Sequence, residues 1–193
     1  MRNLLIILLM FTAGITPHKL SSAQDTADKN PEDSALVRAP SFELVGIDGK
    51  TYRLSDYRAE MPLIVWFTNL CGGCQANIPH LDSVYSAEIK PNAELLAVSL
   101  LGEDKETVAS IRNKLKFRFP ILFDPQGKTC EDYVGEYVEA SCPAVNLFVI
   151  DRQGTIRYET HFPGHSESEA ISMLKTLFDE KAGAAKKGKE DGQ

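Results

Sequence analysis

The apolar run at residues 63–68 constrains the fold more than any other segment of this chain. Its sequence, LIVWFT, is hydrophobic or β-branched throughout, with no alternation of polar residues. Such a strand is buried on both faces, which requires a layer of structure on either side of its sheet. Residues 73–89 follow with apolar groups near helical spacing and with Pro79 as an expected kink. The segment therefore predicts a central strand that passes into a helix in an α/β fold.

Strands and helices alternate along the rest of the chain. Residues 42–45 and 51–54 flank Asp48-Gly49, a pair typical of tight turns, so a β-hairpin is expected at the start of the domain. The other expected elements are strands at 95–100, 121–123, 145–150 and 155–159, and helices at 105–115, 129–133 and 166–178. This order predicts one domain with a mixed central sheet flanked by helices and an N-terminal β-hairpin extension.

The two ends of the chain are expected to lie outside this domain. Arg2 precedes an apolar run, and Ser21-Ser22-Ala23 offers small side chains for cleavage, so residues 1–23 are predicted to be a secretory signal peptide. The run is shorter than the roughly 20 residues of a membrane-spanning helix, although an uncleaved anchor is the alternative. We expect a linker at residues 24–38, the folded domain at 39–180 and a disordered tail at 181–193.

Composition excludes several classes of protein. The 193 residues are 43% hydrophobic and 25% charged, as in ordinary globular domains. Four cysteines are too few for a disulfide scaffold. The formal net charge of −6 argues against a partner that is a nucleic acid, because neutralising phosphates needs a basic surface.

Cys71-Gly72-Gly73-Cys74 lies where the central strand is expected to pass into a helix. Unpaired N–H groups and the helix dipole at such a position stabilise a thiolate at the first cysteine. Cys71 is therefore predicted to be the catalytic nucleophile that attacks a partner's disulfide, and Cys74 the buried thiol that resolves the mixed disulfide. The reverse cycle oxidises a partner's dithiol.

A structural disulfide and a zinc site are the alternatives for this pair. A disulfide that closes so short a loop stabilises the fold by only about 2 kcal/mol. Zinc sites need a second tight pair of ligands, whereas Cys130 and Cys142 are separated by eleven residues. We therefore expect neither a metal nor another cofactor.

Five short motifs between residues 39 and 178 point to a known family. They are Ala39-Pro40-x-Phe42, Asp48-Gly49-Lys50 with Leu54-Ser55-Asp56, Trp66-Phe67, Pro79-x-Leu81, and Pro143 ahead of Phe148-Val149-Ile150-Asp151-x-x-Gly154. Together with the cysteine pair, they resemble the thioredoxin-like thiol-disulfide oxidoreductases of the bacterial cell envelope, the TlpA/ResA-like branch of the AhpC/TSA-related redoxins.

The resemblance implies a thioredoxin-like fold and disulfide exchange with protein partners in the periplasm, reached by export across the inner membrane. The reducing direction is favoured, with a membrane redox partner that recharges the protein. The resemblance also implies that Pro143 is a cis-proline packed against the cysteine pair, beside backbone that pairs with an extended substrate segment. Cys142, directly before it in this substrate-binding loop, would then abut Cys71.

The proton acceptor of the family is missing from its usual position. Thioredoxin has a buried aspartate six residues before its first cysteine, where it accepts a proton from the second thiol. Here that residue is Val65, and glycines stand between the cysteines. Glu136 and Glu139 are the remaining candidates for a general base.

Cys130 and Cys142 form an atypical second pair. In the implied fold, Cys130 on the short preceding helix could reach Cys142. A disulfide between them would stabilise the fold by about 3 kcal/mol, because it lowers the chain entropy of the unfolded state. We expect a Cys130–Cys142 disulfide that is either structural or a second redox couple.

Two other functions stay open. Thr68-x-x-Cys71 matches the end of the peroxiredoxin motif, in which the threonine hydroxyl positions a peroxide on the thiolate, and so predicts a thiol peroxidase that uses Cys71. A non-enzymatic module could instead hold a partner polypeptide, or a metal such as copper, in the cleft over Cys71 and Pro143. Such a module would keep its function without Cys71 and Cys74.

Overall fold

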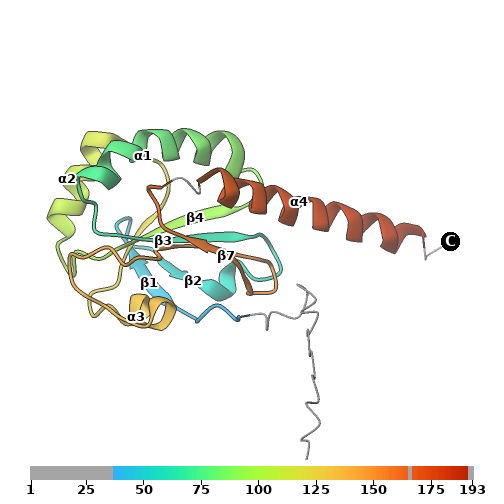
Figure 1. The fold of residues 1–193 in the computed structure, drawn as a ribbon, viewed down its shortest axis with the longest axis horizontal. Coiled ribbons are helices and arrows are strands. Elements are labelled where there is room, and N and C mark those ends of the chain that lie inside the picture. The colour runs from blue at the N-terminus through green and yellow to red at the C-terminus, as the bar shows by residue number, and fades with distance from the viewer. Residues whose placement is uncertain (1–36, 165–166, 191–193) are drawn as a thin grey trace, which may run out of the picture. The chain divides into compact units, whose positions relative to one another are not determined.

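Strand β3 (Leu63–Thr68) lies inside the sheet, as its apolar composition predicts (Figure 1). All six of its residues are buried. It pairs in parallel with β4 (Glu94–Ser99) on one side and antiparallel with β6 (Leu147–Ile150) on the other. The computed structural model, which describes residues 37–164 and 167–190, is built around this strand.

Within the described residues, seven strands form one sheet in the order β2-β1-β5-β4-β3-β6-β7. The strands not yet introduced are β1 (Glu43–Gly46), β2 (Thr51–Arg53), β5 (Ile121–Phe123) and β7 (Ile156–Thr160). The β3–β4 and β4–β5 pairings are parallel, and the others are antiparallel. The predicted mixed sheet is confirmed.

Strands β1 and β2 form the expected N-terminal hairpin. Gly49 in its turn has φ +78°, in the left-handed region that glycine adopts without a steric cost. Asp48 accepts hydrogen bonds from the Lys50 N–H and the Tyr52 hydroxyl. Because β1 also pairs with β5, the hairpin extends the central sheet.

Three helices cover one face of the sheet: α1 (Gly72–Val84), α2 (Lys105–Leu115) and α4 (Glu167–Glu190) (Figure 1). From β3, Ile64 and Trp66 point into this side of the core. The buried side chains that the helices contribute are Cys74, Ile78, Leu81, Val108, Ala170, Leu174 and Leu177. After α1 the chain continues through a π-helical turn at Tyr85–Ile89, so the helix expected over residues 73–89, with Pro79 inside it, is confirmed in extent.

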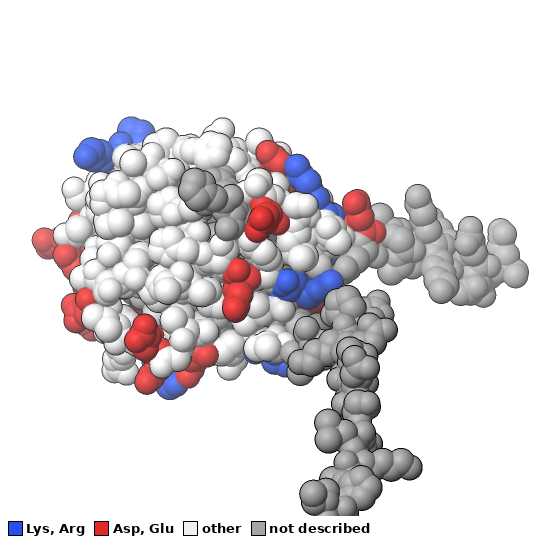
Figure 2. Space-filling view, viewed as in Figure 1, with Lys and Arg blue, Asp and Glu red and all other residues white. Residues whose placement is uncertain are grey.

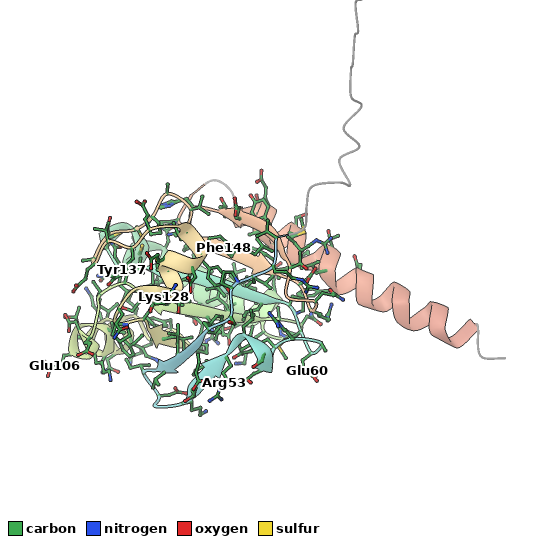
Figure 3. All side chains as sticks on the ribbon, turned by 90° about the horizontal axis from the view of Figure 1, so that it is seen from below. Arg53, Glu60, Glu106, Lys128, Tyr137 and Phe148 are labelled. Carbon is green, nitrogen blue, oxygen red and sulfur yellow. The ribbon has the colours of Figure 1, made fainter. Side chains whose placement is uncertain are left out.

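The opposite face carries the short helix α3 (Lys128–Val134). Because successive strand residues point to opposite faces, Val65 and Phe67 lie on this side. The rings of Phe67, Tyr133 and Phe148 pack with centroids 5.2–6.0 Å apart. Figure 3 is seen from this side and shows Phe148 beside α3, which begins at the labelled Lys128. A 3₁₀ helix at Leu54–Asp56 completes the elements.

The ends of the domain differ in part from expectation. Arg38, assigned to the linker, forms a β-bridge with Thr155. Helix α4 continues to Glu190, although a disordered tail was expected from residue 181; this segment is rich in Ala and Lys, which are good helix formers. The expected signal peptide, most of the linker and the Ser166 helix start lie outside the described residues. None of the helices in the described part of the chain is long and apolar enough to cross a membrane.

Charged side chains are scattered over the face seen in Figure 2. Acidic and basic residues lie there singly or in small groups on a largely uncharged surface.

Candidate active site

The cysteine pair lies at the junction of β3 and α1, as the sequence predicts. Cys71 is the N-cap residue of α1, and its Sγ accepts a hydrogen bond from the backbone N–H of Cys74 at 3.5 Å. Helix N-termini carry unpaired N–H groups that favour a negative charge at this position. The side chain of Cys71 is exposed, so its sulfur can meet a partner.

Cys74 lies one turn further along α1, where it is only 1% exposed. Its Sγ is 3.5 Å from that of Cys71, and both are thiols in this structure. An S–S bond is about 2 Å long, so a small approach of the two side chains would close a disulfide. The arrangement pairs one accessible sulfur with one that a partner cannot reach.

Asn69 holds the turn before the cysteine pair and was missed by sequence reasoning. Its Oδ1 accepts the Cys71 N–H at 3.1 Å, and its Nδ2 donates to the carbonyl of Ala140 at 2.9 Å. Leu70, between Asn69 and Cys71, has φ +51°, which is uncommon for a residue other than glycine. Asn69 therefore ties the cysteine turn to a segment 71 residues away in the chain.

The thiol of Cys74 has no carboxylate among its interacting groups in the described part of the chain. Its pKa is raised well above the ordinary value of a cysteine, chiefly by a hydrogen bond with Cys142 and by burial. The Thr68 hydroxyl opposes this shift through a hydrogen bond to the same sulfur. Val65 is fully buried in the apolar core, and neither Glu136 nor Glu139 is among the groups that perturb Cys74.

Thr68 is turned toward Cys74 and the cysteine turn. It is fully buried, its Oγ1 accepts the Leu70 N–H at 3.0 Å, and its hydroxyl also interacts with the Cys74 sulfur. A hydroxyl engaged in this way supports the resolving thiol and the turn, whereas the peroxiredoxin interpretation requires it to act on Cys71.

Replacing Thr68 by valine should lower the free energy of unfolding by about 1–3 kcal/mol, because the buried Leu70 N–H loses its acceptor. Urea unfolding measures this loss. Thr68→Ser keeps the hydroxyl, so it should lose clearly less stability than Thr68→Val. Equal losses in the two variants would contradict the role given to the hydroxyl.

The expectation for Pro143 is wrong. Among the described residues the only cis peptide bond is Phe162–Pro163, so Cys142 and Pro143 are joined in trans. Asn146, just before β6, still exchanges backbone hydrogen bonds with Phe67 and Thr160, whereas Pro143 lies three residues further out in a loop.

Cys142 contacts the buried cysteine of the pair, where the resemblance had implied Cys71. Its sulfur interacts with the Cys74 thiol and the backbone N–H of Asn69, and it accepts a hydrogen bond from Asn146 Nδ2 at 3.6 Å. The side chain of Cys142 is partly buried against the same core cluster as Cys74. Sequence reasoning therefore placed Cys142 at the site but did not foresee its interaction with Cys74.

Cys130 lies on α3, on the other face of the sheet. Burial raises the pKa of its thiol to about 11. Its Sγ contacts the carbonyl of Glu136 at 3.7 Å. Cys130 and Cys142 line one pocket of about 90 Å³, and both are thiols, so their disulfide stays a prediction.

Within residues 37–164 and 167–190, no group of three or more His, Cys, Asp and Glu side chains is arranged to hold a metal ion.

Comparisons with known proteins give the family and the fold. A family model described as the AhpC/TSA family matches residues 36–159. The thiol-disulfide oxidoreductase ResA of Geobacillus thermodenitrificans is 28% identical over 158 residues, which cover 81% of this chain and 83% of that protein. The chloroplastic peroxiredoxin Q of Populus jackii is 26% identical over 144 residues, with 72% and 66% of the two chains covered.

The solved structure of an uncharacterized thioredoxin-like protein from Porphyromonas gingivalis superposes with a TM-score of 0.57 at 24% identity, covering 75% of this chain and 95% of that one. The fold of the domain is therefore thioredoxin-like, as expected.

Proposed function

Because the chain belongs to the AhpC/TSA family, we propose that it is a thiol-disulfide oxidoreductase that exchanges disulfides with protein partners through Cys71 and Cys74. The observation that carries this proposal is the pairing of an exposed sulfur at a helix N-terminus with a buried sulfur 3.5 Å away. A relative named thiol-disulfide oxidoreductase, aligned over 81% of the chain, supports it.

The proposed cycle needs only these two thiols. The Cys71 thiolate attacks one sulfur of the partner's disulfide, forming a mixed disulfide and releasing the partner's other sulfur as a thiolate. Cys74 then attacks the Cys71 sulfur, which forms the Cys71–Cys74 disulfide and breaks the mixed disulfide. The partner's sulfur leaves with the electron pair and takes up the proton that Cys74 loses, so the partner is released in its reduced form. The partner gains two electrons and the enzyme loses two, so a separate reductant must return them.

The environment of Cys74 supports the reducing direction. A strongly oxidising couple is one whose reduced form is stabilised as a thiolate. Burial and the contact with Cys142 raise the pKa of Cys74, which disfavours its thiolate. We infer a reductase that works outside the cytoplasm, in keeping with the leader expected at residues 1–23, and that a membrane redox partner recharges.

A thiol peroxidase is the second candidate, since a peroxiredoxin is among the relatives. The interaction of the Thr68 hydroxyl with Cys74 and Leu70 gives it less support. We therefore prefer protein disulfides to peroxides as substrates.

The test compares two substrates on the purified protein. In the presence of dithiothreitol it should reduce the disulfides of insulin, measured as turbidity, and consume hydrogen peroxide no faster than free cysteine. A Cys71→Ser/Cys74→Ser variant is the control. It should not accelerate insulin reduction and should not consume hydrogen peroxide. Fast peroxide consumption would favour the peroxidase, and a wild-type protein that accelerates neither reaction would favour a binding module.

Two further experiments test the reducing direction and the location outside the cytoplasm. The Cys71–Cys74 couple should be more reducing than glutathione when titrated against it. In cells, a membrane-impermeant maleimide should label Cys71 once the outer membrane is permeabilised. An oxidising midpoint or protection from the reagent would contradict the respective part of the proposal.

A further inference from the structure

Three of the four cysteines lie together at the active site. Cys71 is exposed, Cys74 is buried 3.5 Å behind it, and Cys142 contacts Cys74 from the loop before β6. The proposed cycle uses only the first two. The pocket of about 90 Å³ lies beyond Cys142, with Cys130 in its wall.

Polar groups converge on the sulfur of Cys142. Cys74 and the backbone N–H of Asn69 interact with it, and the fully buried Asn146 donates through Nδ2 at 3.6 Å. These hydrogen bonds, the one from Cys74 first, hold the pKa of Cys142 below the ordinary value of a cysteine despite burial. The positive charge of a protonated His161 acts in the same direction.

Asn146 is held rigidly in this position. Its Oδ1 accepts the Phe162 N–H at 2.7 Å, and its Nδ2 also donates to the Phe162 carbonyl at 2.9 Å. Its backbone pairs with Phe67 on β3 and Thr160 on β7. The donor that faces Cys142 is therefore anchored to the sheet.

We propose that Cys142 is a third redox-active thiol, which exchanges with the Cys71–Cys74 disulfide and moves it to Cys74–Cys142. The inference rests on the proposed function, because it starts from the disulfide that the proposed cycle forms. It is carried by the packing of Cys142 against the core cluster that contains Cys74, the half of that disulfide that lies inside the protein, and the interaction of the two thiols supports it.

The exchange balances without an external oxidant. The Cys142 thiolate attacks Cys74 Sγ, an S–S bond forms between Cys74 and Cys142, and the bond between Cys71 and Cys74 breaks. Cys71 leaves with the electron pair as a thiolate at the N-terminus of α1. One disulfide and one thiolate are present before and after the step.

The oxidised protein then has two forms that differ at its surface. In one, Cys71 is bound in a disulfide with Cys74. In the other, Cys71 is a free nucleophile while the disulfide is held between the buried Cys74 and the partly buried Cys142. A dithiol partner that attacks the sulfur of Cys71 can reduce only the first form.

Mapping of disulfides in the singly oxidised full chain tests the proposal. The wild-type protein is oxidised with one equivalent of glutathione disulfide, quenched with acid, labelled with N-ethylmaleimide and mapped by mass spectrometry. Molecules with labelled Cys71 and a Cys74–Cys142 disulfide should make up at least about one tenth of the oxidised protein. A tenfold preference for the other disulfide corresponds to only about 1.4 kcal/mol.

Matched variants complete the test. Cys142→Ser, and Cys142→Ala if the serine variant does not fold, should lose the labelled Cys71 population entirely. Cys130→Ser changes the other cysteine of the pocket and should retain it. Absence of the Cys74–Cys142 disulfide from both wild type and Cys130→Ser would overturn the inference while leaving the proposed function intact. If neither the wild type nor the variants form the Cys71–Cys74 disulfide, the inference and the proposed function both fail.

Discussion

Replacing Cys74 by serine should stop turnover and leave the partner polypeptide covalently bound to Cys71. Cys71 is exposed and can still attack a disulfide, but the group 3.5 Å behind it is no longer a thiol. A serine hydroxyl is a poor nucleophile toward a disulfide, so the mixed disulfide is not resolved. Insulin reduction should fall to the rate of dithiothreitol alone. When the reduced variant is mixed with insulin after removal of dithiothreitol, up to one partner chain per enzyme should remain attached on a non-reducing gel.

Two variants serve as controls for the adduct at Cys71. Cys71→Ser should lose turnover equally but form no adduct, because the attacking sulfur is gone. Cys130→Ser should turn over like the wild type, since Cys130 lies on the other face of the sheet. Cys142 contacts Cys74 and does not replace it, so the adduct should persist with Cys142 present. Adducts that form equally well without Cys71 would show that another cysteine is the nucleophile.

Replacing Trp66 by alanine should lower the free energy of unfolding by about 3–5 kcal/mol. Trp66 is fully buried in β3, and its ring packs edge-on against Phe162 at 5.2 Å and Phe119 at 6.2 Å. Removal of the ring leaves a cavity between the sheet and the helices that cover it. A domain of this kind is stable by only about 5–15 kcal/mol, so a substantial part of its stability would be lost.

Trp66→Phe is the matched control, because it keeps an aromatic ring between the same neighbours and should lose much less stability. Trp66 is the only tryptophan of the chain, so unfolding in urea is followed by circular dichroism in place of fluorescence. A loss below about 1 kcal/mol for Trp66→Ala would mean that the core repacks around the gap.

The sheet and most helices could be predicted because their patterns are local. The apolar run at residues 63–68 is β3, and the helix expected at residues 105–115 is α2, with the same bounds. The hairpin at Asp48-Gly49 follows from the turn preference of that pair. Helix α4 runs further than expected, to Glu190, and its last turns contain several Ala and Lys residues, which are good helix formers.

The surroundings of the cysteine pair could not be predicted in the same way. Asn69 and Asn146 carry no motif, and Thr68 belongs to a motif that predicts a contact with Cys71. Each of the three acts through a contact that the sequence does not display. The resemblance to a family suggested a cis-proline at Pro143, but the structure joins Cys142 and Pro143 in trans.

By itself, the sequence determined the α/β class, the central strand and the position of Cys71 and Cys74 at a strand-to-helix junction. Each of these depends on residues within a few positions of one another. Only the tertiary structure decided that Cys142 lies against Cys74. That contact depends on the register of β3 with β6, in which Val65 faces Phe148 and Trp66 faces Leu147. A shift of this register by one residue would turn every side chain of β6 to the other face of the sheet. No local sequence pattern specifies where the loop that carries Cys142 then lies.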